Sequence, residues 1–101
     1  MLEVRLRPDA RRDLAGIWVY TKRRWSRAQA DKYVSAIRAE IGRLCRQPAL
    51  GRAVNNMQAP FLKRRSGSHV IFYLVSGTTL DVVRVLHANM DFSAHLANDD
   101  V

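Results

Sequence analysis

The stretch "HVIFYLVSGTTLDVVRVLH", residues 69–87, decides the fold, because it reads as two apolar strands joined by a short turn. Residues 69–75 are apolar on both faces of the predicted strand, which carry Ile71, Tyr73 and Val75 on one side and Val70, Phe72 and Leu74 on the other. Residues 79–87 follow a similar pattern. A strand of this kind lies inside a sheet and needs a covering layer on each face. The chain or a partner must therefore supply two layers.

A helical hairpin is predicted before this stretch and supplies one layer. Residues 2–6 alternate like a half-buried strand, and Pro8 then opens a helix that runs to about residue 25. Ser26 and Gln29 form a capping box that starts a second helix, which ends before Pro48. The connection is short, so the two helices are expected to be antiparallel. The apolar stripe of the first helix contains Ala10, Leu14, Ile17, Trp18 and Trp25.

The remaining elements give an α+β fold in a single domain, residues 1–101. Residues 48–60 are expected to be an irregular loop, followed by strands at 61–65, 69–75 and 79–87 and a short helix at about 90–96. The predicted order is β-α-α-β-β-β with a helical hairpin packed on an antiparallel sheet and a short C-terminal helix. That last helix is small, so we expect a second polypeptide to cover the other sheet face. The alternative is that the sheet is covered by the chain's own loop.

The charge of the chain points to an acidic or polyanionic partner. Lys and Arg number 17 against nine Asp and Glu, for a net charge of +8. An alternative explanation for the charge is that the arginine-rich composition follows from a GC-rich genome. Cys45 is the only cysteine and cannot form an internal disulfide, no apolar run is long enough to span a membrane, and the first ten residues lack an apolar signal stretch. These features predict a cytoplasmic location.

Catalytic chemistry is suggested only by a basic cluster. We find no metal-ligand spacing, phosphate loop or nucleophile elbow, and we expect neither metal nor cofactor. Lys63, Arg64 and Arg65 on one strand and Arg84 and His87 on another could support RNA cleavage, which needs proton transfer and cations for the phosphorane charge. However, Arg84 and His87 are three residues apart and would face opposite sides of a strand without a bulge. The structural alternative is an ion pair for Arg84 and a strand-end hydrogen bond for His87.

Aromatic residues of the hairpin could be mistaken for a base-stacking platform, namely Trp18, Tyr20, Trp25 and Tyr33. Trp18 and Tyr33 fall on the apolar stripes, so we interpret them as core of the hairpin.

Five segments, in order, resemble the signature segments of ParE toxins in the RelE/ParE superfamily of type II toxin–antitoxin systems. They are "DLAGIWVYTKRRW", "QADKY", "PALGR", "RRSGSHVIFY" and "VVRVLHANMD", and the similarity runs from about Leu6 to Leu96. The resemblance implies the fold predicted above and a ParD-type antitoxin with an acidic C-terminal region that neutralises the chain. It also implies inhibition of DNA gyrase by binding rather than by an enzymatic reaction, with nucleic acid met only through the antitoxin or the gyrase complex.

RelE-type relatives share the fold but cleave mRNA on the ribosome, which leaves an alternative. By similarity to them, Arg65, Arg84 and His87 would carry phosphate binding and acid–base chemistry. This chain departs from their pattern because no tyrosine follows Tyr73 and lysine is scarce.

The two sets of expected contacts are as follows. For the antitoxin we expect Phe61, Leu62, Arg64, Arg65, Phe72, Leu74, Arg84, Met90 and Phe92. For gyrase we favour the segment from Arg84 to Leu96, with Arg84, His87, Met90, Asp91, Phe92, His95 and Leu96 as candidates.

Overall fold

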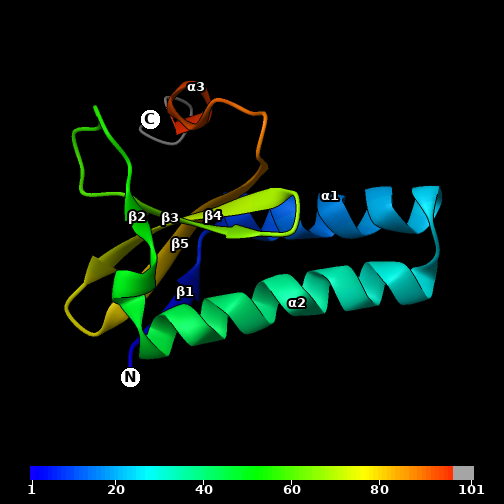
Figure 1. The fold of residues 1–101 in the computed structure, drawn as a ribbon, viewed down its shortest axis with the longest axis horizontal. Coiled ribbons are helices and arrows are strands. Elements are labelled where there is room, and N and C mark those ends of the chain that lie inside the picture. The colour runs from blue at the N-terminus through cyan, green and yellow to red at the C-terminus, as the bar shows by residue number, and fades with distance from the viewer. Residues whose placement is uncertain (97–101) are drawn as a thin grey trace.

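The computed structural model describes residues 1–96 and has the predicted α+β architecture (Figure 1). Its elements are β1 (Glu3–Leu6), α1 (Pro8–Arg24), α2 (Arg27–Arg46), the 3-10 turn η1 (Pro48–Leu50), β2 (Arg52–Ala53), β3 (Leu62–Ser66), β4 (His69–Ser76), β5 (Thr79–His87) and α3 (Phe92–Leu96). The sheet has the strand order β1-β5-β4-β3-β2. β1 is parallel to β5, and the other neighbours are antiparallel. None of the helices in this part of the chain combines the length and apolarity that crossing a membrane requires.

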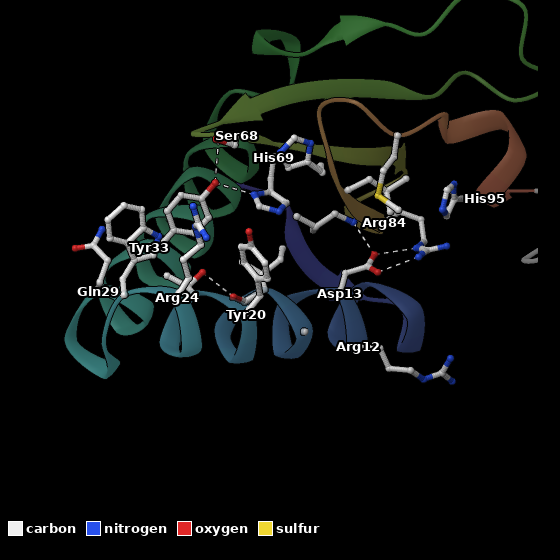
Figure 2. Close-up of a pocket in the computed structure, with 18 residues that line it drawn as sticks. Arg12, Asp13, Tyr20, Arg24, Gln29, Tyr33, Ser68, His69, Arg84 and His95 are labelled. Carbon is white, nitrogen blue, oxygen red and sulfur yellow. Dashed lines mark hydrogen bonds and ion pairs between the residues drawn. The ribbon is translucent and has the colours of Figure 1, made fainter.

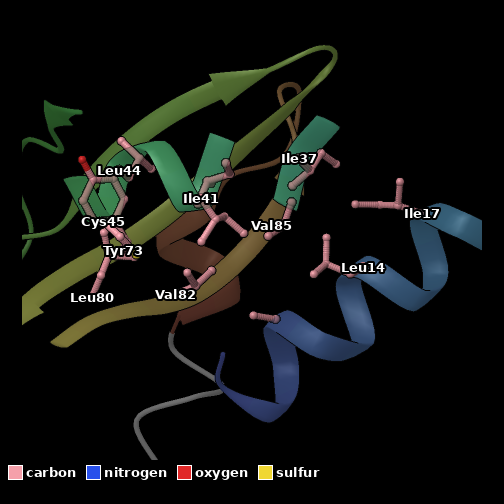
Figure 3. Close-up of a cluster of buried hydrophobic side chains, with 12 residues drawn as sticks. Leu14, Ile17, Ile37, Ile41, Leu44, Cys45, Tyr73, Leu80, Val82 and Val85 are labelled. Atoms are coloured by element: carbon pink, nitrogen blue, oxygen red, sulfur yellow. The ribbon is translucent and has the colours of Figure 1, made fainter. Parts of the chain in front are cut away.

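The helical hairpin covers one face of the sheet, as predicted. The side-chain oxygen of Ser26 accepts a hydrogen bond from the Gln29 N–H at 3.0 Å, so Ser26 caps α2. The apolar sides of both helices meet one sheet face in a core that includes Leu14, Ile37 and Tyr73 (Figure 3). We call this the hairpin-side core.

Trp25 does not belong to that core, in contrast to the predicted stripe. It follows the last residue of α1, and 69% of it is exposed. Thr21 takes the buried position one turn earlier. Its hydroxyl can be buried because it donates a hydrogen bond to the Ile17 carbonyl at 2.7 Å. The helical stripe therefore ends before the hairpin does, and a large indole is left in solvent.

The second sheet face is covered by the chain itself, so it needs no partner for its cover, and the alternative of self-cover is the one observed. A second core of buried residues contains Phe61, Phe72, Val83, Leu86 and Phe92, and Val54, Met57 and Ala59 pack against it. The covering residues come from α3 and from the loop before β3, which the Val54 N–H closes by donating to the Phe61 carbonyl at 2.9 Å. Figure 1 shows α3 on the side of the sheet away from the hairpin. We call this cluster the phenylalanine core.

β5 contains a bulge that changes which side chains share a face. Phe72 pairs with Arg84 and Tyr73 pairs with Val82, so Val83 is an extra residue opposite β4. Beyond the bulge the alternation is reset, and Val85 joins the hairpin-side core. The bulge lies before Arg84, and the register from Arg84 to His87 is regular, so these two residues start from opposite faces of β5 as expected. Both nevertheless line one groove, because the Arg84 side chain reaches Asp13 on α1.

Candidate functional site

An open groove of about 730 Å³ lies between α1, the β3–β4 turn and the end of β5 (Figure 2). Its lining residues are Arg12, Asp13, Gly16, Ile17, Tyr20, Thr21, Arg24, Trp25, Gln29, Tyr33, Ser68, His69, Arg84, Val85, Leu86, His87, Met90 and His95. This volume lies within the range of small-ligand sites. We call it the hairpin groove.

One wall of the hairpin groove is fixed by an ion pair between Asp13 on α1 and Arg84 on β5. Asp13 accepts from the Arg84 Nε at 2.8 Å and from its Nη2 at 2.9 Å, which is a two-pronged pair. It also accepts from the Val85 N–H at 2.9 Å. β1 pairs with β5 only as far as Val82, so Asp13 satisfies a backbone donor on the edge that β1 leaves open. The structural alternative for Arg84, an ion pair, is what the structure contains.

The opposite wall holds two histidines and a tyrosine in contact. His69 faces His87 across the β4–β5 pair, with ring centroids 5.4 Å apart and an interplanar angle of 80°. The Tyr33 hydroxyl lies 2.7 Å from the His69 Nδ1 and accepts from the Ser68 N–H at 2.9 Å. Since that hydroxyl oxygen already accepts from the backbone, its hydrogen can go to His69, whose own proton is then on Nε2.

The surroundings of His69 favour its uncharged form. Burial lowers the pKa of His69 below its ordinary value, and the neighbouring His87 lowers it further against an opposing effect of Asp13. The His87 Nδ1 accepts from the Asn89 N–H at 3.2 Å, the strand-end hydrogen bond that was the structural alternative for this residue. A ring nitrogen that accepts a hydrogen bond carries no proton, so this bond selects the Nε2–H tautomer of the neutral His87 ring.

The three residues of the nuclease hypothesis are only partly brought together. Arg84 and His87 line the hairpin groove, but Arg65 is exposed on β3 and its Nε donates to the Gly67 carbonyl at 2.9 Å. Its neighbour Arg64 turns to the helices, where it donates to Glu40 at 3.0 Å.

Most of the apolar antitoxin candidates are not on the surface. Phe92 is stacked on Phe72 with centroids 3.9 Å apart and meets Phe61 edge to face at 5.0 Å. All three are buried, so a partner reaches them only if α3 moves away. Leu62 packs against the hairpin-side core and Leu74 against the phenylalanine core.

The gyrase candidates near the C-terminal end are more accessible. Met90 is 45% exposed and lines the hairpin groove together with His95. Asp91 starts α3 by accepting from the Ser93 N–H at 3.1 Å and its hydroxyl at 2.7 Å, and these bonds lower the pKa of Asp91. The side chain of Leu96 lies outside the described residues, as do residues 97–101.

Several groove residues were missed by sequence reasoning. Asp13 carries no local signal, because it sits on a helix among arginines and its partner is 71 residues away. Tyr33 was interpreted as core, and it does pack against the hairpin-side core, but its hydroxyl reaches His69. Within residues 1–96, no three His, Cys, Asp or Glu side chains are grouped closely enough to hold a metal ion.

Comparisons with known proteins place this geometry in a family. The family described as "ParE toxin of type II toxin-antitoxin system, parDE" matches residues 4–92. Toxin ParE1 of Caulobacter vibrioides is 38% identical over 96 residues, which is 95% of this chain and 99% of that protein. Toxin ParE1 of Mycobacterium tuberculosis is 40% identical over 92 residues, 90% of this chain and 94% of that protein.

Two solved structures share the fold. A chain of the chromosomal ParDE system from P. aeruginosa has a TM-score of 0.70 at 19% identity, and covers 86% of this chain and 96% of its own. A chain of the RelBE2 toxin–antitoxin complex from Mycobacterium tuberculosis has a TM-score of 0.66 at 24% identity, and covers 85% and 96% respectively. At these identities they support the fold alone, whereas the sequence relatives and the family match carry the assignment. The chain belongs to the ParE toxin family of type II toxin–antitoxin systems.

Proposed function

We propose that this chain is a toxin that inhibits DNA gyrase by binding it, and that a ParD-type antitoxin neutralises it in the cytoplasm. Family membership supports the toxin role. The observation that favours binding over catalysis is the Asp13–Arg84 pair, in which the Arg84 Nε and Nη2 both donate to the Asp13 carboxylate. A cation that stabilises a phosphorane must direct its charge at the reacting phosphate, and this one is largely neutralised by Asp13.

The proposed antitoxin contacts divide into two groups. Arg65 and Met90 are exposed and available to an acidic, partly apolar segment without rearrangement. Phe61, Phe72 and Phe92 become contacts only if the antitoxin displaces α3 and takes its place on the phenylalanine core. Net charge of +8 on the chain favours an acidic partner in either group.

The proposed gyrase contact is the end of β5 and the segment that follows it. Met90 and His95 form one rim of the hairpin groove. They follow a strand that is held on its open edge by Asp13, so a partly exposed rim is attached to a fixed base.

The test is a cleavage assay with purified gyrase and supercoiled plasmid. The chain should cause linear plasmid to accumulate after protein denaturation, and Met90→Ala with His95→Ala should reduce that product. Arg52→Ala on the distant β2 edge serves as the matched surface control and should leave the product unchanged. If linear DNA accumulates to the same extent with all variants, Met90 and His95 are not the gyrase contact. If no linear DNA forms with the wild-type chain, gyrase is not the target.

A second candidate is ribosome-dependent mRNA cleavage, because His69, His87 and Arg84 do share one groove. Two adjacent imidazoles could serve as proton donor and acceptor. In that case His87→Ala, an exposed position, should slow mRNA cleavage on ribosomes by at least about 100-fold. The binding proposal instead predicts intact mRNA with wild-type chain and with the variant.

A further inference from the structure

Two large aromatic residues at the closed end of the helical hairpin have no role in either core. Trp25 is 69% exposed and Tyr20 is 64% exposed, and both line the hairpin groove. Aromatic side chains on a soluble protein usually gain stability by burial, so a pair left in solvent at the mouth of a groove marks a binding surface. With Arg24, which also lines the groove, they form what we call the hairpin-end surface.

The charge around this surface is positive and is not offset locally. Residues 14–30 contain four Lys and Arg and no Asp or Glu. Of the flanking carboxylates, Asp13 is paired with Arg84, whereas Asp31 accepts from the neutral Trp18 Nε1–H at 2.8 Å and keeps its charge, so the net charge nearby stays positive. The Arg24 guanidinium lies 5.9 Å from the Trp25 ring centroid, which places a cation beside an exposed π face.

The groove behind the hairpin-end surface is lined by flat groups. Six of its lining residues carry rings, namely Tyr20, Trp25, Tyr33, His69, His87 and His95. Gly16 has no side chain to narrow the groove on the α1 side, and a Cβ atom there would meet nothing within 4 Å. Ring faces and guanidinium planes accept stacked bases.

We propose that the hairpin-end surface binds single-stranded DNA directly, with a base stacked on Trp25 and Tyr20 and phosphates held by Arg24 and its neighbours Arg23 and Arg27. Stacking on aromatic rings beside cations is the general means by which proteins hold single strands without reading their sequence. The sequence alone led us to expect nucleic acid only through the antitoxin or gyrase. The choice of DNA over RNA rests on the proposed function, in which the target enzyme holds cleaved DNA.

The experiment measures fluorescence anisotropy of a labelled oligothymidylate of about 12 nucleotides, within the site size of known single-strand binders. Trp25→Ala should weaken binding about tenfold, as expected for one stacked base, and Trp25→Phe should retain most of it. Arg46→Ala is the matched control, because it removes one exposed cation at the far end of α2 and should weaken binding less than about threefold. Circular dichroism should report an unchanged fold, since Trp25 is exposed.

The outcomes separate the alternatives. Equal losses in Trp25→Ala and Arg46→Ala would reduce the interaction to general charge attraction and overturn the site. Tighter binding of oligouridylate would overturn the choice of DNA, and displacement of the oligonucleotide by a synthetic Glu- and Leu-rich helical peptide that itself loses affinity in Trp25→Ala would identify a peptide surface instead. The same variants enter the gyrase assay, where linear plasmid without any oligonucleotide binding would refute this inference and leave the proposed function standing.

Discussion

Replacing Asp13 by alanine should be among the most destabilising changes to a polar residue of this chain. The Asp13 carboxylate accepts three hydrogen bonds, two from Arg84 and one from the Val85 N–H, all at 2.8–2.9 Å. The Asp13 and Arg84 side chains are only 13% and 15% exposed, so water replaces little of what is lost.

The magnitude follows from this geometry. Removing one partner of a buried ion pair costs about 3–5 kcal/mol, and a hydrogen bond to a charged group contributes about 1.5–3 kcal/mol. The groove beside the pair is open to solvent, which moderates both figures. We therefore expect Asp13→Ala to lower the free energy of unfolding by about 2–4 kcal/mol, a large share of the roughly 5–15 kcal/mol typical of a domain.

Urea unfolding followed by circular dichroism measures this loss. Asp9→Ala is the matched control on the same helix, because Asp9 pairs with Arg12 at 2.7 Å in a pair whose arginine is 76% exposed. That variant should cost at most about 1 kcal/mol. A double-mutant cycle between Asp13→Ala and Arg84→Ala should give a coupling energy above about 1 kcal/mol. Equal costs for Asp13→Ala and Asp9→Ala, or a coupling near zero, would refute the assignment of the pair as the clamp between α1 and β5.

Three further predictions concern the walls and the cover of the groove. Gly67→Ala should destabilise the chain by about 1–2 kcal/mol in urea unfolding, because Gly67 has φ +60° and a Cβ atom would lie 2.7 Å from the Tyr33 hydroxyl; no change would mean that the turn relaxes freely. Because the folded-state pKa of His69 is lowered, the unfolded chain binds more protons, and stability should fall as pH decreases through about 6.5. His69→Gln should flatten that dependence between pH 7.5 and 5.5, and an unchanged slope would contradict it. Phe92→Ala should speed amide exchange in the loop before β3 and lower stability by about 3 kcal/mol, since it removes the stacked partner of Phe72; protection as in the wild type would show that α3 is not the cover.

The sequence predicted elements whose signals are local. Pro8 and Ser26 mark the starts of α1 and α2, and both helices begin where those residues place them. Gly67 and Gly77 stand at the two β turns with φ of +60° and +57°, conformations that other residues adopt only with strain. A cap or a positive φ is decided by a few adjacent residues, which is why pattern reasoning finds it.

What the sequence did not predict depends on contacts between distant residues. The loop before β3 looks irregular because it has no period, yet Val54 and Met57 bury their side chains against the phenylalanine core. The bulge at Val83 also has no local sequence signal. The stretch "VVRV" is typical of a continuous strand, and only the pairing with β4 reveals the extra residue. The alternation of side chains along one strand does not indicate a change in that strand's register with its neighbour.

That single extra residue decides what the hairpin groove can do. In an uninterrupted strand that starts from Val82 on the hairpin side, His87 would face the phenylalanine core and Leu86 the groove. With the bulge, Leu86 is buried in the phenylalanine core and His87 stands opposite His69. The groove therefore gains a second imidazole while Arg84 stays bound to Asp13, so proton-transfer groups are present but the guanidinium beside them is already paired. A groove with rings, open space and an Arg84 that is held by Asp13 is suited to bind a partner by stacking and apolar contact, and this is why we favour binding over cleavage.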